Sequence, residues 1–152
     1  MNTKNSMVFT LGVWDGMHIG HLKLLERASK LGHILIVGVV EDNAVKAVKG
    51  EDRPKHKENE RLEIVRAIKF VDDALLVPNF DPNFFVRKYS NHDYHIHYSN
   101  NFSDNLVYVY GEDQTHLKKL VEPLFTIVYM DRTPGVSTTD LHFGGTDATS
   151  IK

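Results

Sequence analysis

The stretch from His33 to Val40 is an almost unbroken aliphatic run, and it restricts the fold more than any other part of the chain. A strand with apolar side chains on both faces is typical of a parallel sheet that is covered on both sides. A shorter apolar stretch at 7–11 predicts an earlier strand, which Gly12 ends. Between the two strands, apolar residues recur at helical spacing at Leu22, Leu25, Ala28 and Leu31. Gly32 stands where a C-cap glycine is expected, so this region predicts a strand–turn–helix–strand unit.

The rest of the chain repeats this alternation of strands and helices. The pattern predicts a short helix and loop at 41–57, a helix at 58–70, a strand at 74–78, a helix from Asp81-Pro82 to Tyr89, a strand at 106–110, a helix at 115–121 and a strand at 124–130. We therefore expect an α/β, Rossmann-like fold, with a five-stranded parallel sheet and helices on both faces. Residues 1–141 would form one domain, and the polar segment 142–152 is expected to be a poorly ordered tail.

Composition narrows the class of protein. A chain of 152 residues is long enough for one domain with a substantial core. Its net charge of -2 argues against general nucleic-acid binding, and the absence of cysteine excludes disulfides and thiolate metal sites. The first residues lack the apolar core of a signal peptide, and no apolar run is long enough to span a bilayer. We expect a cytoplasmic protein without membrane insertion.

Four polar clusters follow predicted strands. They are the sequence GVWDGMHIGH at 12–21, the cations Lys46, Lys49 and Arg53, the short run Gly111-Glu112-Asp113, and the run RTPGVSTT at 132–139. Ligands of open parallel sheets bind beyond the carboxyl ends of the strands, where these clusters would meet.

The chemistry of these clusters suits a ligand rich in phosphate. A glycine turn that opens a helix presents free N–H groups and the positive end of the helix dipole. His18 and His21 add donors, which are strong when protonated, and the lysines and arginines add positive charge. No cluster supplies an obvious nucleophile. The pattern therefore favours phosphoryl or nucleotidyl transfer, in which positioning and charge neutralisation carry catalysis.

Each cluster alone has a simpler interpretation. The two histidines could be a chance pair, the lysines a solvated face, and Ser137-Thr138-Thr139 a plain helix N-cap. No third ligand points to zinc, so no metal site is predicted for the histidine pair. The alternation of His92, His95 and His97 suggests a strand edge or loop more than a metal site. Only the joint occurrence of the clusters, at successive strand ends, favours function.

Taken together, these motifs resemble the cytidylyltransferase family from about Val8 to Leu141. The resemblance is to the glycerol-3-phosphate, phosphoethanolamine and phosphocholine cytidylyltransferases in particular. The His-x-Gly-His motif marks the wider nucleotidyltransferase superfamily, whereas Arg-Thr-x-Gly-x-Ser-Thr-Thr goes with CTP in that family. The resemblance implies transfer of CMP from CTP to a small phosphomonoester, with release of pyrophosphate. It also implies Mg²⁺, held mainly by substrate phosphates, and a homodimer.

The resemblance further assigns roles to individual residues. The residues implied to neutralise charge in the reaction are His18, His21, Lys49 and Arg132. Those implied to bind the nucleotide are Gly12, Val13, Trp14, Asp15, Gly20, Asp113, Thr133, Ser137 and Thr138. Candidate phosphate contacts are Lys46 and Lys69, and Phe80 is a candidate on the acceptor side.

Several departures keep alternatives open. The run from Lys49 to Pro54 is more similar to the heptose-phosphate adenylyltransferases, which use ATP. Lys69 stands where relatives often carry arginine, and Trp14 replaces a smaller aromatic residue. An adenylyltransferase that uses ATP and a sugar phosphate is therefore the first alternative, and a nucleotide-binding module without catalysis is the second. The class I aminoacyl-tRNA synthetases share His-Ile-Gly-His, but this chain is short for them and has no second lysine-rich signature.

Overall fold

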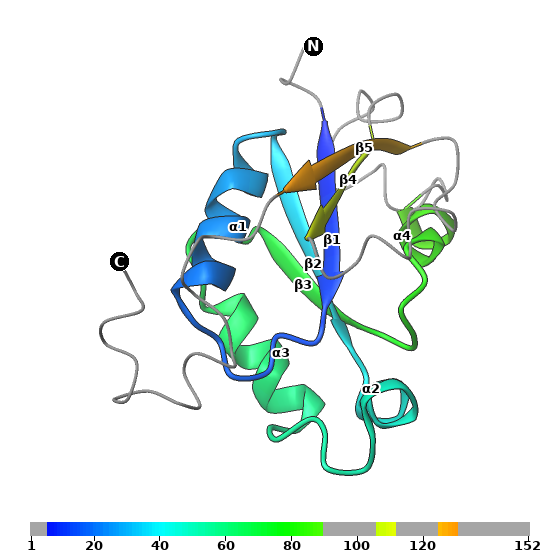
Figure 1. Cartoon of the computed structure of the whole chain (residues 1–152). Coiled ribbons are helices and arrows are strands. Elements are labelled where there is room, and N and C mark those ends of the chain that lie inside the picture. Colours follow the sequence, from blue (N-terminus) through cyan, green and yellow to red (C-terminus); the bar gives the residue numbers. More distant parts are fainter. Residues whose placement is uncertain (1–5, 90–105, 112–124, 131–152) are drawn as a thin grey trace.

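A five-stranded parallel sheet forms the centre of the molecule (Figure 1). The computed structural model describes residues 6–89, 106–111 and 125–130. The strands are β1 (Met7–Gly12), β2 (Ile34–Val40), β3 (Asp73–Val77), β4 (Leu106–Gly111) and β5 (Phe125–Met130). Their order in the sheet is β3-β2-β1-β4-β5, and every neighbouring pair is parallel. The predicted fold class is confirmed.

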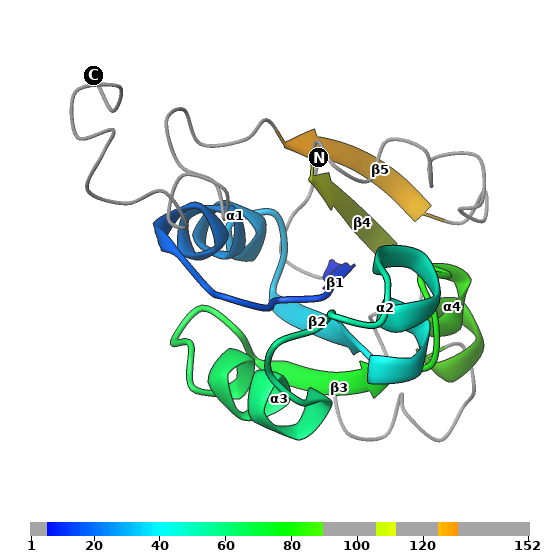
Figure 2. The ribbon, with the colours of Figure 1, turned by 60° about the horizontal axis from the view of Figure 1, so that its bottom comes forward.

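Four described helices cover the two faces of the sheet (Figure 2). They are α1 (Ile19–Ser29), α2 (Asp42–Lys49), α3 (Glu58–Arg66) and α4 (Asn83–Tyr89). α1 and α3 pack on one face, and α2 and α4 pack on the other. None of the described helices is long and apolar enough to cross a membrane.

The two faces have different cores, because alternate residues of each strand point to opposite sides. Under α1 and α3 the buried strand residues are mainly aliphatic, as at Val8, Leu35, Val37, Val107 and Val109. Under α2 and α4 the cluster is rich in aromatic rings, namely Phe9, Phe85, Tyr89, Tyr108 and Tyr110. β1 is fully buried between its two neighbours, which explains why it is apolar except at Thr10, whose hydroxyl donates to the carbonyl oxygen of Val109 at 3.1 Å.

Two local predictions are wrong. Gly32 is not the C-cap of α1, because that helix ends at Ser29 and Lys30 caps it in a right-handed conformation. Gly32 instead allows a close approach, since a Cβ there would lie 2.6 Å from the carbonyl oxygen of Ser6. α3 ends at Arg66 rather than at residue 70. The backbone N–H of Ala67 closes its last turn. The predicted helix at 115–121 and the tail at 142–152 lie outside the described residues.

The topology directs attention to one edge of the sheet. From β1 the chain moves outward to β2 and β3, and it then returns to the other side of β1 as β4. The carboxyl ends of β1 and β4 therefore flank a topological switch point, the usual ligand site of such sheets. The loops that follow β1 and β2 both lie at this edge (Figure 1).

Candidate functional site

The turn after β1 contains a strained tryptophan. Trp14 has a φ of 57°, in the left-handed region, where a non-glycine residue costs about 1–2 kcal/mol. Its side chain is buried, and its indole N–H donates to the carbonyl oxygen of Gly38 in β2 at 2.9 Å. Burying a large apolar side chain contributes about 1.5–3 kcal/mol, which offsets the strain. The Trp14 side chain thus lies in the core, and only its backbone can contact a nucleotide.

Gly12 leaves space for this packing. A Cβ at position 12 would lie 3.0 Å from indole carbon Cε2 of Trp14, closer than real Cβ contacts normally are. The missing side chain therefore makes room for the indole, whether or not a nucleotide also approaches there. Gly16 completes the turn with a φ of 63°.

The two histidines form a fixed pair at the start of α1. His18 is the N-cap residue, and its Nδ1 accepts the backbone N–H of Gly20 at 3.0 Å. Nδ1 of His21 accepts the backbone N–H of His18 at 3.2 Å, and the ring centroids are 3.9 Å apart. A ring nitrogen that accepts an N–H carries no proton, so each ring carries its N–H on Nε2. The arrangement therefore favours neutral rings with Nε2–H donors.

Asp15 holds the loop that precedes α3. Its two carboxylate oxygens accept the backbone N–H groups of Lys55, at 2.8 Å, and His56, at 3.1 Å. A carboxylate that accepts two N–H groups is a strong local anchor. Asp15 therefore shapes the site by joining the turn after β1 to the loop at 50–57.

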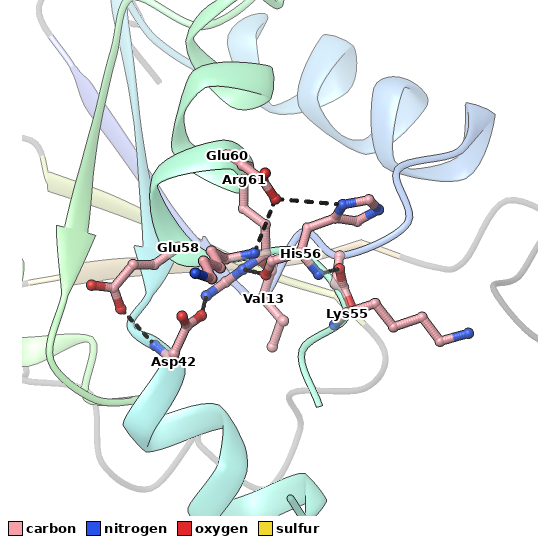
Figure 3. Close-up of polar contacts among 9 residues, drawn as sticks. Val13, Asp42, Lys55, His56, Glu58, Glu60 and Arg61 are labelled. Atoms are coloured by element: carbon pink, nitrogen blue, oxygen red, sulfur yellow. Dashed lines mark hydrogen bonds and ion pairs between the residues drawn. The ribbon is translucent and has the colours of Figure 1, made fainter. Parts of the chain in front are cut away.

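Arg61 of α3 joins the same segments (Figure 3). It is fully buried, and its guanidinium donates to the carbonyl oxygens of Val13, at 2.7 Å, and His56, at 3.0 Å. It also donates to the carboxylate of Asp42, the first residue of α2, at 2.6 Å. A buried guanidinium is tolerated only when its donors are satisfied in this way.

The sequence analysis did not identify Arg61 as a site residue, although a signal was present. The predicted buried face of α3 consists of Leu62, Val65 and Ile68, and Arg61 lies one helical turn before Val65. A charged residue within an apolar stripe must have partners elsewhere in the fold. Its position therefore pointed to a buried polar junction.

The lysines of α2 are held differently. The backbone N–H of Asp42 donates to the carboxylate of Glu58 at 2.8 Å, so the start of α2 is anchored to the start of α3. Lys46 and Lys49 lie in the last turn of α2 and are exposed. Gly50 then ends the helix with a φ of 98°. The two lysines therefore lie on a helix that follows β2 at the same edge of the sheet as the histidines. Their side chains are exposed, whereas the histidine rings accept backbone hydrogen bonds.

Lys69 does not lie at this edge. It follows α3 and precedes β3, at the amino ends of the strands, and its Nζ lies 5.1 Å from the ring centroid of Phe70. Lys69 therefore lies at the opposite edge of the sheet from the histidine pair, and its candidate phosphate contact stays a prediction. Phe80 follows the carboxyl end of β3 and packs against the aromatic cluster, so it remains a candidate on the acceptor side.

Two buried tyrosines lie near the switch point, on the α4 side of β4. Burial raises the pKa of the Tyr108 phenol, and the Leu11 backbone opposes this effect only in part. Burial also raises the pKa of Tyr110. Both phenols therefore stay neutral well above physiological pH.

Several predicted residues lie outside the described residues, namely Asp113, Arg132, Thr133, Ser137, Thr138 and the histidines at 92, 95 and 97. Asp113 follows the end of β4 by two residues in the sequence, and Arg132 follows the end of β5 by two. Their roles stay predictions.

A family model described as "Cytidylyltransferase-like" matches residues 9–142. The chain belongs to this family of nucleotidyltransferases. Among the similar proteins are the bifunctional protein HldE of Campylobacter fetus subsp. fetus, 38% identical over 77 residues, and that of Campylobacter jejuni subsp. doylei, 43% identical over 76 residues. These matches cover 51% and 50% of this chain but only 17% and 16% of those proteins, so the chain spans less than a fifth of their length.

Solved structures agree with the fold. A lipopolysaccharide core biosynthesis protein from Thermoplasma volcanium is 26% identical with a TM-score of 0.55, and the match covers 84% of this chain and 95% of that one. Pantothenate synthetase from Thermus thermophilus is 14% identical with a TM-score of 0.54, over 99% of this chain and 66% of that one. The second likeness shows the shared fold alone.

Proposed function

We propose that this nucleotidyltransferase is an adenylyltransferase, which transfers AMP from ATP to a sugar phosphate and releases pyrophosphate. The observation that carries the transfer chemistry is the histidine pair, fixed as Nε2–H donors where α1 begins beside the switch point. The sugar-phosphate acceptor and ATP are supported by the run from Lys49 to Pro54, which resembles heptose-phosphate adenylyltransferases. The matches to the HldE proteins and to the lipopolysaccharide core biosynthesis protein favour the same choice.

In the proposed reaction, a phosphate oxygen of the acceptor attacks the α-phosphorus of ATP in line. The bond from that phosphorus to the bridging oxygen breaks, and the electron pair leaves with pyrophosphate. His18 and His21 donate from Nε2 to phosphate oxygens as charge develops, and the N-terminus of α1 adds its partial positive charge. Lys49 and Lys46 approach the phosphates from the end of α2.

The remaining roles belong to the proposal as well. Arg132, Thr133, Ser137 and Thr138 would hold the triphosphate from the far side, and Asp113 would lie near the nucleoside. Within the described segments no group of three or more His, Asp or Glu side chains is placed to hold a metal ion. Mg²⁺ would be coordinated mainly by the phosphates of the nucleotide and would neutralise their charge.

CTP remains the second candidate nucleotide. The run RTPGVSTT at 132–139 resembles the CTP motif of the cytidylyltransferases, and the acceptor would then be a small phosphomonoester such as glycerol 3-phosphate. The two candidates differ in nucleotide and acceptor but share the phosphate chemistry. They therefore predict the same histidine geometry and different products.

Pyrophosphate release, with product identification by mass spectrometry, separates these candidates. The full chain would be assayed with ATP or CTP against heptose phosphates, glycerol 3-phosphate, phosphoethanolamine and phosphocholine. We expect pyrophosphate and an ADP-sugar from ATP with a heptose phosphate. A CMP-linked product from CTP alone would replace the adenylyl proposal with the cytidylyl one. Nucleotide binding by calorimetry without turnover on any acceptor would indicate a binding module.

The family resemblance also implies a homodimer. Multi-angle light scattering of the purified chain tests this directly, and a mass of one chain at assay concentration would contradict it.

A further inference from the structure

Trp14 is held from two sides at the base of the histidine pair. It is the single tryptophan of the chain, and its residue surface is 5% exposed. Its indole N–H is bonded to Gly38 of β2, and its ring lies against the backbone of Gly12. These contacts fix the indole to the rigid centre of the sheet.

The indole in turn contacts the ring of His21. The two ring centroids are 5.6 Å apart with an interplanar angle of 68°, an edge arrangement that aromatic rings favour. His21 accepts the backbone N–H of His18, and the two imidazoles are 3.9 Å apart. A continuous series of contacts therefore runs from β2 through Trp14 to both histidines.

We propose that Trp14 is a positioning residue that sets the ring plane of His21 and, through it, the donor of His18. The part of this inference that concerns turnover rests on the proposed function. The resemblance implied that Trp14 binds nucleotide, but burial keeps its side chain from that role. Trp14 also has a left-handed backbone conformation, and strained residues of this kind cluster at active sites.

The indole N–H distinguishes tryptophan from the smaller aromatic residue expected at this position. Phenylalanine would keep an aromatic edge against His21 but lose the bond to Gly38 that fixes the ring. Leucine would lose both. The two substitutions therefore separate the anchor from the aromatic contact.

The first experiment does not depend on substrate. Long-range ¹⁵N–¹H correlation spectra of the histidine rings would be recorded for wild type, Trp14→Phe and Trp14→Leu. We expect His21 of the wild type as a single Nε2–H tautomer, little change in Trp14→Phe, and a mixture of tautomers in Trp14→Leu. Val65→Ala is the matched control, because Val65 is buried in the same cluster on α3. It should lower the melting temperature and keep the His21 tautomer.

The second experiment measures turnover with ATP and a heptose phosphate. We expect kcat of Trp14→Leu to fall about 10- to 100-fold with KM for ATP changed less than about twofold, because a misplaced donor affects the transition state. Trp14→Phe should lie between this variant and the wild type. Unchanged tautomer and kcat in Trp14→Leu, or an equal loss of kcat in Val65→Ala, would overturn the inference. Absence of turnover in the wild type would instead contradict the proposed function, and the spectra would still decide the role of Trp14.

Discussion

The histidine pair and the α2 lysines would meet the same phosphates, but the protein holds them in opposite ways. His18 and His21 are fixed by two backbone hydrogen bonds and by ring contacts, and their turn is tied down by Asp15 and Arg61. The side chains of Lys46 and Lys49 are exposed in the last turn of a helix whose polar contacts to Glu58 and Arg61 are made by its first residue, Asp42.

This difference suggests that the two groups contribute to different steps of the reaction. A donor that is already in place needs no reorganisation when charge develops, so the histidines suit the transition state. A flexible lysine loses about 2 kcal/mol of rotamer entropy when it is fixed, and the ligand must supply that ordering. The histidines should therefore act mainly on kcat and the lysines mainly on binding.

The largest effect should come from substitution of Arg61, which supports the turn that carries the histidine pair. Arg61→Ala leaves the carboxylate of Asp42 and the carbonyl of Val13 without their donor, which should lower the unfolding free energy by about 3–5 kcal/mol in urea titrations. Arg66→Ala on the same helix is the control, because that side chain is exposed and bonds only the carbonyl oxygen of Ala74. Its cost should be about 1 kcal/mol or less. Equal costs for the two variants would show that the buried junction does not support the turn.

His18→Ser tests the donor itself. Serine is a good N-cap residue, so it should keep the start of α1 stable to within about 0.5 kcal/mol while removing the imidazole. We expect kcat to fall about 10²- to 10³-fold, as for loss of a preorganised donor elsewhere. His33→Ala, an exposed histidine at the other edge of the sheet, is the control and should keep full activity. A variant with normal kcat and a raised KM would reverse the assignment.

The sequence was sufficient to predict the fold because the relevant signals are local. Continuous apolar runs such as 33–40 indicate burial on both faces of a strand, and the order of strands and helices then restricts the topology. The place of the histidines was predictable for the same reason, since a glycine turn between β1 and a helix must lie at the carboxyl edge of the sheet.

The hydrogen bonds that hold the site in place were not predictable in this way, because they join residues that are distant in sequence. Asp15 bonds residues some 40 positions away, Arg61 reaches back to Val13, and Trp14 bonds Gly38. No local pattern encodes such pairings. Lys69 shows the converse, because the structure places this candidate phosphate contact before β3, at the opposite edge of the sheet from the histidine pair.

Lys49→Ala tests the contribution of the exposed α2 lysines to nucleotide binding. We expect KM for the nucleotide to rise about tenfold, equivalent to about 1.4 kcal/mol, with a smaller change in kcat. Lys23→Ala is the matched control, since Lys23 is exposed on α1 and forms an ion pair with Glu26 at 3.4 Å. Exposed pairs of that kind contribute little, so its kinetics should equal those of the wild type. A fall in kcat as large as that of His18→Ser would remove the distinction between the two groups.

Ionic strength should give the smallest effect and separate the two groups without changing a catalytic residue. Raising salt from about 0.1 M to about 1 M shortens the Debye length from about 10 Å to about 3 Å, which screens exposed charges most. KM for the nucleotide should therefore rise in the wild type and rise less in Lys49→Ala, because that variant has already lost one of the screened contacts. The turnover step carried by neutral, partly buried histidines should change little, since a neutral Nε2–H donor offers no charge to screen. A loss of kcat with salt that persists in Lys49→Ala would mean that the histidines act as cations, in conflict with the tautomer that their Nδ1 bonds impose.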